Sequence, residues 1–363
     1  MNPERSGELP PGPPGGATET GPPEAVPVSE LGAWNTRLEK LLRETSRSFH
    51  LSLRFLPAPL REPLSIAYLL ARSSDTLADS PHAEVQIRVQ ALDALEQALH
   101  RIGSEASPLI HITLAARAHA VQAVSGIPGD SPAEGRLLAH LDAVLESFER
   151  QNDGVRREVL EVLGPIISAQ RQDLLRFGDA RADAPRALES AAECEDYTYA
   201  VAGCVGEFWT RICALRMPHT LAAPKELLML HGKRLGQGLQ LVNILRDLPA
   251  DLARGCCYLP RDEIEALGLE LLNLTSNPAA ARSWITPWMA RAREWLAHGE
   301  RYVEGIRGWR LRFSVILPRL LGEATLDLLQ KNPPLETRER VRVDRKTVFR
   351  CLWEASLEAS HLF

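Results

Sequence analysis

The sequence predicts an all-α fold. From Ser29 onward, apolar residues recur at three- and four-residue steps, the spacing of one buried helix face. Alanine, leucine, glutamate and arginine dominate these stretches, and all four favour helices. Runs of alternating apolar and polar residues, which would predict half-buried strands, are absent. We therefore expect one helical domain over residues 29–363, with about ten to twelve helices and no internal repeat.

Five segments carry the helical pattern most clearly, and turn residues such as Gly126-Ile127-Pro128-Gly129 separate them. In chain order the expected helices are Val85–Ile102, Pro132–Arg150, Val155–Phe177, Leu221–Arg246 and Thr286–Ile306. Pro249 follows the fourth, and proline inside a helix removes a hydrogen bond and clashes one turn back. We therefore expect a kinked or frayed turn there, with Asp251 held less firmly than Asp79.

The first 28 residues differ from the rest of the chain. They hold eight prolines and five glycines and show no hydrophobic period. Such a composition predicts a disordered tail over residues 1–28. The segment lacks the arginine-rich amphipathic pattern of a transit peptide and the apolar core of a signal peptide.

Composition excludes several classes of protein. A chain of 363 residues that is 45% hydrophobic can bury a large core. A net charge of −5 lacks the basic footprint of a nucleic-acid-binding protein. The six cysteines have no paired CxxC spacing, so we expect free thiols in a reducing cytosol. No apolar run approaches the ~20 residues that span a bilayer, and we expect a cytoplasmic protein that at most touches a membrane peripherally.

Two aspartate pairs share one spacing, Asp75 with Asp79 and Asp247 with Asp251. Positions i and i+4 share a helix face, so each pair points two carboxylates the same way. On a solvated face this would cost only ~0.2–0.5 kcal/mol. The flanking residues are apolar, however, and inside a cavity the repulsion needs a positive charge to offset it. Magnesium prefers one or two carboxylates together with substrate phosphate oxygens, so the pairs predict a site for magnesium-bound diphosphate.

Neighbouring polar residues extend this predicted site. Asn243, one turn before Asp247, can complete an oxygen-ligand set, and Gln240 lies on the same face. Three arginines could each pair with a nearby aspartate or bind a diphosphate through the guanidinium donor fork: Arg72, Arg246 and Arg254. Arg254 is the stronger diphosphate candidate of the last two, because it follows the metal site.

Four stretches in this order carry a family likeness: Ser46-Arg47-Ser48-Phe49, Tyr68 to Asp79, Tyr197 to Gly206, and Gln240 to Asp251 with its continuation Arg254 to Pro260. A single DxxxD motif is weak evidence, whereas four ordered motifs are specific. Over roughly residues 40–330 the chain resembles the squalene and phytoene synthases, which are head-to-head prenyl synthases of the isoprenoid synthase fold. It is most similar to bacterial members, since the C-terminal membrane helix of eukaryotic enzymes is absent.

The resemblance implies a helical bundle around a central apolar cavity that binds farnesyl diphosphate, with Mg²⁺ and NADPH as cofactors. It implies catalytic roles for the four aspartates and for Tyr197, which would relay a proton or stabilise a cation; a packed core phenol is the alternative. Asn243 would join the aspartates as a metal ligand. The implied substrate contacts are Ser46, Ser48, Phe49, Tyr68, Arg72, Val201, Gly203, Gly206, Gln240, Asn243, Arg246, Arg254 and Tyr258.

The product is the finer question. Asp75-Thr76-Leu77-Ala78-Asp79 and the stretch Phe313 to Leu326 are of squalene synthase type, although Ser314 stands where the family usually has phenylalanine. Tyr258-Leu259-Pro260 also occurs in phytoene synthases. We favour squalene made through presqualene diphosphate, with product release at a membrane. Phytoene, dehydrosqualene or hydroxysqualene synthesis without the reductive step remains an alternative, as does a non-catalytic assembly factor, against which the four retained aspartates argue.

Overall fold

The computed structural model describes residues 36–46, 53, 55–80, 83–103, 110–336 and 340–361. Every structural statement below concerns these residues. The predicted disordered tail, together with Ser48 and Phe49 of the first motif, lies outside them, so those predictions stay untested.

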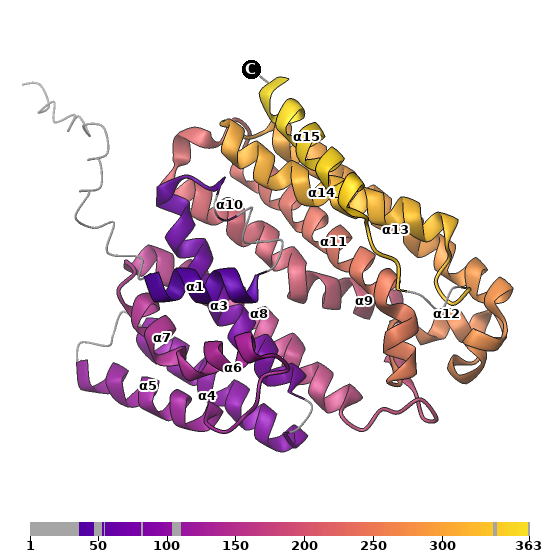
Figure 1. Ribbon diagram of the computed structural model, residues 1–363, viewed down its shortest axis with the longest axis horizontal. Helices are drawn as coiled ribbons and strands as arrows, with labels where there is room; N and C mark the ends of the chain where they lie inside the picture. The colour runs from indigo at the N-terminus through magenta and orange to yellow at the C-terminus, as the bar shows by residue number, and fades with distance from the viewer. Residues whose placement is uncertain are drawn as a thin grey trace, which may run out of the picture. The chain divides into compact units, whose positions relative to one another are not determined.

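Helices build the described domain, which contains fourteen α-helices and two short strands (Figure 1). In chain order the elements are α1 (Thr36–Thr45), α3 (Ala58–Asp79), α4 (Val85–Gly103), α5 (Ile110–Val124), α6 (Pro132–Ala139), α7 (Leu141–Glu149), α8 (Asp153–Phe177), β1 (Arg186–Leu188), α9 (Ala191–Thr198), η2 (Tyr199–Gly203), α10 (Cys204–Arg216), η3 (Pro218–Thr220), α11 (Lys225–Ala253), β2 (Cys256–Pro260), α12 (Arg261–Ala266), η4 (Leu271–Ser276), α13 (Pro278–Glu304), α14 (Trp309–Lys331) and α15 (Arg345–His361). The all-α prediction is confirmed.

Some predicted boundaries were wrong for local reasons. The expected helix Pro132–Arg150 is divided into α6 and α7, because His140 leaves the helical region with φ −114° and ψ 16°. Ser131 begins α6 through a capping box with Glu134, which satisfies two backbone N–H groups at the helix start. The short helices raise the number of helices in the described residues above the expected ten to twelve.

The strands were not expected either. β1 and β2 form a parallel pair in which Arg186 lies opposite Cys256 and Leu188 opposite Pro260. Strands of three and five residues are too short to show a repeating pattern, and tertiary contact between distant segments forms them. The pair matters for the site because β2 follows α11 directly and holds Tyr258.

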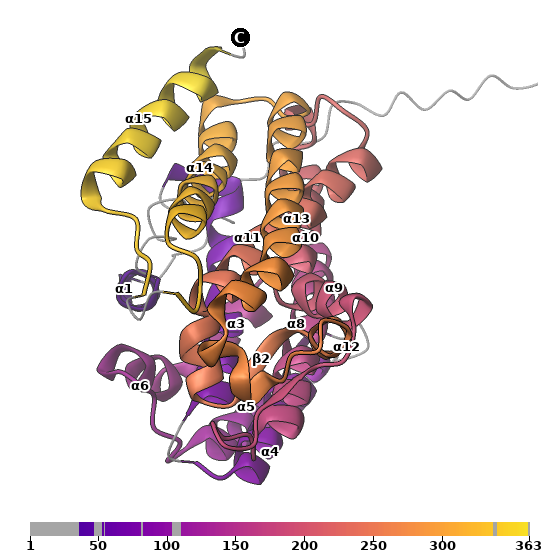
Figure 2. The same cartoon turned by 90° about the vertical axis from the view of Figure 1, so that its right-hand side faces the viewer.

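α11 is the central helix of the bundle and packs against α10, α13 and α14, while α8 packs against α3, α4 and α10 (Figure 2). The approach of α10 to α11 is so close that a Cβ at Gly206 would lie 1.9 Å from the carbonyl oxygen of Gly232. A side chain at Gly203 would likewise meet Gln237 on α11. These glycines therefore allow close helix packing. Their expected contact with a substrate stays a prediction.

Pro249 does not end α11, which continues to Ala253. Asp251 is only 7% exposed and accepts a 2.6 Å hydrogen bond from Arg254. The predicted fraying was therefore wrong, since packing of α11 in the bundle outweighs the one backbone hydrogen bond that proline removes. A kink at Pro249 stays a prediction. No helix in the described part of the chain is long and apolar enough to cross a bilayer.

Candidate active site

A cavity of about 860 Å³ brings the two aspartate motifs together. Asp75 and Asp79 reach it from α3, Asp247 reaches it from α11, and α8 contributes a third wall. The lining combines charged groups with an apolar part: Ile166, Leu174, Phe177 and Val201. Segments far apart in the sequence thus present carboxylates and apolar side chains to one space.

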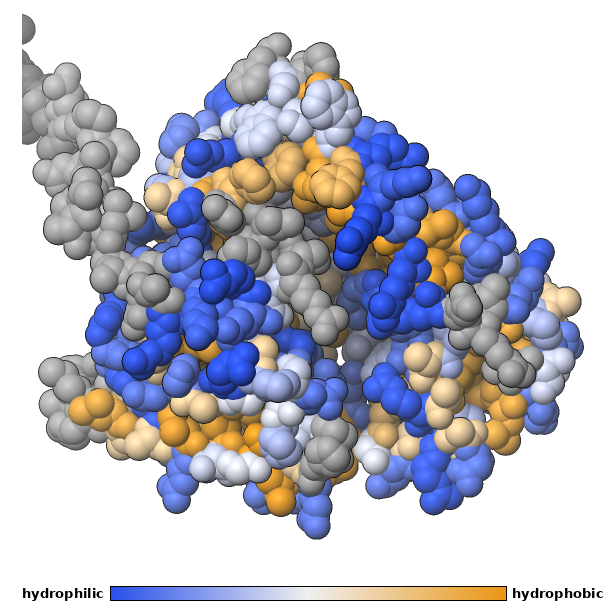
Figure 3. Space-filling model, viewed as in Figure 1, coloured by the Kyte–Doolittle hydropathy of each residue, from blue (hydrophilic) through white to orange (hydrophobic). Residues whose placement is uncertain are grey.

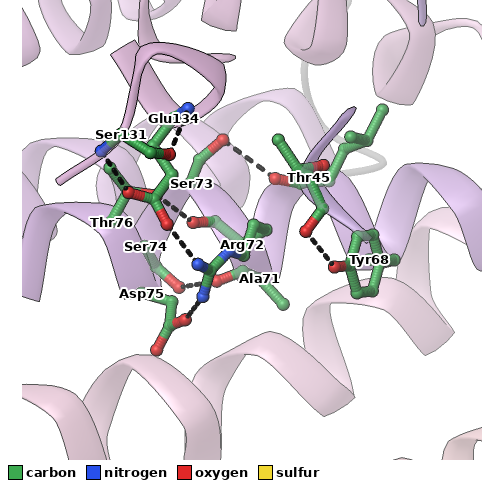
Figure 4. A network of polar contacts seen from close by, with 11 residues as sticks. Thr45, Tyr68, Ala71, Arg72, Ser73, Ser74, Asp75, Thr76, Ser131 and Glu134 are labelled. Carbon is green, nitrogen blue, oxygen red and sulfur yellow. Dashed lines mark hydrogen bonds and ion pairs between the residues drawn. The ribbon is translucent and has the colours of Figure 1, made fainter. Parts of the chain in front are cut away.

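Arg72 is held between two carboxylates at the first motif (Figure 4). Its guanidinium contacts Asp75 on its own helix and Glu134 on α6. Glu134 is fixed in turn, because the backbone N–H of Ser131 donates to its carboxylate at 3.0 Å. The capping box of α6 therefore positions Arg72. Asp79 makes no comparable ion pair within the described residues.

The positive charge near the two carboxylates of the first motif does not offset their burial and mutual repulsion. Burial and, after it, the neighbouring charge of Asp75 together raise the pKa of Asp79 to about 7, against the opposing effect of Arg72. Burial also raises the pKa of Asp75, although Arg72 opposes this. Both side chains line the cavity. Burial in the protein and the repulsion between the two carboxylates therefore cause the raised pKa values. A divalent cation at this place would relieve the repulsion.

Arginines neutralise the second motif. Arg246 donates to both oxygens of Asp247, at 3.0 Å from Nε and 2.6 Å from Nη2. Arg340, from the segment before α15, donates to the same two oxygens at 2.8 and 3.0 Å. Arg254 pairs with Asp251. The second motif therefore carries three guanidinium groups at the cavity.

The titration of these groups follows from that arrangement. Burial would raise the pKa of Asp247, but Arg246 and Arg340 outweigh it and hold the pKa below its usual range. Burial raises the pKa of Asp251 despite its bond to Arg254. Arg254 also lowers the pKa of Asp79, so the two motifs are electrostatically linked.

A tyrosine pair shares one buried carboxylate beside the aspartates. The hydroxyls of Tyr197 and Tyr258 both donate to Oδ2 of Asp173, each at 3.2 Å. Their rings stack with centroids 4.8 Å apart. Burial raises the pKa of Asp173 to about 7, although both tyrosine hydrogen bonds lower it. The π-helical turn η2 begins two residues after Tyr197, and such turns occur frequently at functional sites.

Two residues of this site, Asp173 and Arg340, were not predicted from the sequence. Asp173 carries no motif spacing, and its only signal is a polar side chain on a helix with a largely apolar buried face. Arg340 lies in the last thirty residues, beyond the resemblance, and its only signal is the basic segment around it. Both became visible through tertiary contacts.

The remaining predicted residues divide into two groups. Val201, Gln240 and Asn243 line the cavity, and the Asn243 amide donates to the Gln240 side chain at 3.5 Å. Ser46 and Tyr68 bond to backbone carbonyls instead, and the hydroxyl of Tyr68 donates to Thr45 at 3.1 Å (Figure 4). Burial raises the pKa of Tyr68 to about 12.

The donor chemistry fits a metal ion that brings part of its own ligand shell. Within the described ranges, no three histidine, cysteine, aspartate or glutamate side chains converge as a metal cage. Magnesium does not require one, because it keeps waters and takes phosphate oxygens beside one or two carboxylates. The residues at the cavity that would hold it are Asp75, Asp79, Asn243 and Asp247, whereas Asp251 of the predicted set is not among the lining residues and is bonded to Arg254.

The squalene/phytoene synthase family model matches residues 42–347. The chain therefore belongs to the squalene/phytoene synthase family, whose members are prenyltransferase-type enzymes. It is 25% identical over 321 residues to a squalene synthase of Gibberella zeae, covering 86% of this chain and 63% of that one. It is 26% identical over 290 residues to a presqualene diphosphate synthase of Zymomonas mobilis, covering 79% of this chain and 80% of that one. A phytoene synthase of Mycobacterium tuberculosis is 24% identical over 274 residues, with 73% of this chain and 72% of the relative covered.

Solved structures share the fold. The ligand complex of TcSQS with BPH1237 superposes with a TM-score of 0.70 at 20% identity, covering 89% of this chain and 86% of that one. A dehydrosqualene synthase in complex with ligand superposes with a TM-score of 0.59 at 19% identity, covering 89% of this chain and 95% of that one. The squalene synthase HpnC from Alicyclobacillus acidocaldarius reaches 0.56 at 22% identity, covering 81% and 92%. The isoprenoid synthase fold expected from the sequence is confirmed.

Proposed function

We propose that this protein condenses two farnesyl diphosphates head to head, through presqualene diphosphate, to squalene. Magnesium would be the metal and NADPH the hydride donor. The observation that carries the proposal is the meeting of both aspartate motifs at one cavity, beside several arginines and an apolar wall. Its volume of about 860 Å³ falls within the range of roughly 300–1,000 Å³ that is usual for ligand pockets.

Diphosphate binding would use the charges on both sides of the cavity. Magnesium held on the carboxylates would accept the charge that develops on a departing diphosphate. Arg246 and Arg340 both bond to Asp247 in the structure, and their forks match phosphate oxygens as well as they match a carboxylate. When an anionic diphosphate enters, either guanidinium can exchange the carboxylate for it.

Tyr197 and Asp173 would move the proton. Closure of the cyclopropane requires a carbon-bound proton to leave the condensed cation. The phenol oxygen of Tyr197 would accept that proton while its own hydroxyl proton passes to Asp173, to which it is already hydrogen-bonded. A pKa of about 7 lets Asp173 be ionised before this step and protonated after it. The apolar wall would keep water from quenching the cation.

The reductive step distinguishes the proposal from its alternative. The chain has no glycine-rich dinucleotide fingerprint, and we assign NADPH no residues. Ser314 is buried on α14, and its hydroxyl donates to the Arg310 carbonyl at 2.8 Å. A phenylalanine substituted there would overpack the helix interface, so the product itself is the better test. The alternative is a member that omits the hydride step, as the similarity to phytoene and presqualene diphosphate synthases suggests.

Product analysis tests the proposal directly. Purified protein is given farnesyl diphosphate and Mg²⁺, with and without NADPH, and the lipids are separated. We expect squalene with NADPH, and presqualene diphosphate or cation-derived alcohols and dehydrosqualene without it. Dehydrosqualene or hydroxysqualene as the main product at saturating NADPH would refute the squalene assignment. Phytoene formed only from geranylgeranyl diphosphate would place the protein on the carotenoid branch, and no turnover of either substrate would support an assembly factor.

A further inference from the structure

The outer face of α15 carries an apolar stripe that the bundle leaves uncovered. Phe349 is 70% exposed, Trp353 67% and Leu357 41%. Their spacing of four residues places them along one side of the helix. The opposite side, formed by Cys351, Ala355 and Ala359, is buried. Large apolar side chains thus face outward on a helix whose small side chains already serve the core.

The stripe continues onto neighbouring elements. The indole N–H of Trp309, at the start of α14, donates to the Ser356 carbonyl of α15 at 3.2 Å. Phe55, which is partly exposed, meets Trp309 edge-on with centroids 6.4 Å apart. Apolar side chains gather beside α15 on the face shown in Figure 3. We call the side chains of Phe55, Trp309, Phe349, Trp353 and Leu357 the α15 patch.

α15 cannot rotate to bury this apolar stripe against the helical bundle, because ion pairs hold its opposite side to α14. Arg319 of α14, which is almost fully buried, donates to both carboxylate oxygens of Glu358 at 2.8 and 2.7 Å. The same guanidinium also pairs with Glu300 and Glu323. In Figure 2, α15 lies beyond α14 at the edge of the bundle. The α15 patch therefore faces outward in the folded protein.

Positive charge gathers at the N-terminal end of the patch although the whole chain is acidic. Residues 340–350 contain five basic residues and one acidic residue, whereas the chain carries a net charge of −5. Four of the five basic side chains are exposed: Arg342, Arg345, Lys346 and Arg350. Of these, Arg350 is paired at 3.7 Å with Glu354, an exposed acidic residue on the same helix. Aromatic and aliphatic side chains flanked by lysine and arginine on one helix face are typical of helices that lie in a bilayer interface.

We propose that the α15 patch docks the protein onto the surface of an anionic lipid bilayer. Trp353, Phe349 and Leu357 would enter the headgroup region, and the surrounding basic side chains would contact anionic headgroups. The charge complementarity favours a lipid surface over an apolar protein partner. Membrane docking through this surface does not depend on the reaction proposed above. Its biological purpose, which would be the release of an apolar product into the bilayer, does rest on that proposed function.

Sedimentation with vesicles tests this surface without substrate. Full-length protein is mixed with vesicles of phosphatidylcholine alone or of phosphatidylcholine with phosphatidylglycerol. We expect binding to the anionic vesicles that weakens with added salt, and at least about tenfold weaker binding for Phe349→Ser with Trp353→Ser. Lys346→Glu with Arg350→Glu should lose the preference for anionic lipid. The matched control is Leu175→Ser with Leu267→Ser, which removes side chains 63% and 50% exposed elsewhere and should bind like the wild type.

The same variants distinguish the other occupants of the patch. Circular dichroism and turnover of detergent-dispersed substrate should be unchanged in all of them, since none touches the cavity. The proposal would be overturned if the wild-type protein bound neither type of vesicle. It would also be overturned if Phe349→Ser with Trp353→Ser bound vesicles as tightly as the wild type. A wild-type dimer that the serine variants convert to monomer, without vesicle binding, would assign the patch to a second copy of this chain.

Discussion

Arg340 donates to both carboxylate oxygens of Asp247 from a segment 93 residues further along the chain. The contact adds Arg340, from the segment before α15, to the lining of the cavity. It also explains in part why Asp247 has a lowered pKa, while the other aspartates of the two motifs have raised ones. A residue outside the recognised motifs thus controls the charge of a residue inside them.

Replacing Arg340 should weaken diphosphate binding. In Arg340→Gln the cavity loses one guanidinium group that could donate two hydrogen bonds to a diphosphate. Hydrogen bonds to charged groups contribute about 1.5–3 kcal/mol of binding free energy. We expect KM to rise roughly ten- to a hundredfold and the pKa of Asp247 to rise. Steady-state kinetics with the farnesyl substrate measures the first effect. Arg342→Gln, an exposed neighbour, is the control; equal KM values for wild type and Arg340→Gln would exclude the role.

Removal of one carboxylate from either aspartate motif should abolish turnover. Asp75→Asn and Asp247→Asn should each lower kcat by at least about a hundredfold, because the metal loses a charged ligand. The fold should survive in both, since asparagine keeps the shape of the side chain. Asp75→Asn also relieves the repulsion with Asp79, whereas Asp247→Asn weakens the contacts of Arg246 and Arg340 and should lower stability somewhat. Turnover and circular dichroism are compared with those of Asp327→Asn, a surface aspartate on α14. Wild-type activity of either variant at saturating Mg²⁺ would contradict the metal site.

Tyr197 and Tyr258 form a matched pair of test positions, because both donate to Asp173 at 3.2 Å. If Tyr197 relays the proton, Tyr197→Phe should slow formation of presqualene diphosphate and leave substrate binding nearly unchanged. Tyr258→Phe removes the same hydrogen bond and should have the smaller effect on kcat. Rapid-quench measurement of the first half-reaction separates the two. An unchanged rate of the first half-reaction in Tyr197→Phe would make Tyr197 a packing residue.

Asp173 should give the protein a measurable pH dependence. Its pKa in the folded state is about 7, against about 3.9 when unfolded, so the folded state binds more protons between these values. Stability therefore falls as pH rises from about 4 to about 7. Asp173→Asn should remove part of this fall, so its thermal midpoint should exceed that of the wild type by on the order of 2 °C at pH 8 and match it near pH 4.

The same variant has a kinetic readout. Ionised Asp173 is the form that accepts the proton from Tyr197, so wild-type kcat should decrease as pH falls through about 7. Asp173→Asn should be slow at every pH and lose this limb. The prediction is contradicted if the thermal midpoint and kcat of the variant depend on pH in the same way as those of the wild type. Asp173 would then titrate outside this pH range.

Much of the site was predictable because its motifs are local. Asp75 and Asp79 share a face on α3 by helix geometry alone, and the structure places both on the cavity. Gln240, Asn243 and Asp247 follow the same rule on α11. Ser46 and Tyr68 were expected at the substrate, yet they bond to backbone carbonyls nearby. Sequence spacing predicts which residues share a face, but not which space that face meets.

The helical class, the family and the faces on which the aspartates lie could be predicted without a structure, because they depend on short-range periodicity and ordered motifs. The packed fold was needed to show that α3, α8 and α11 enclose one cavity, that Asp173 joins Tyr197 to Tyr258, and that Arg340 reaches Asp247. It also decided which side of α15 stays uncovered. These features join residues far apart in the chain, and packing of whole helices, which no local pattern encodes, brings them together.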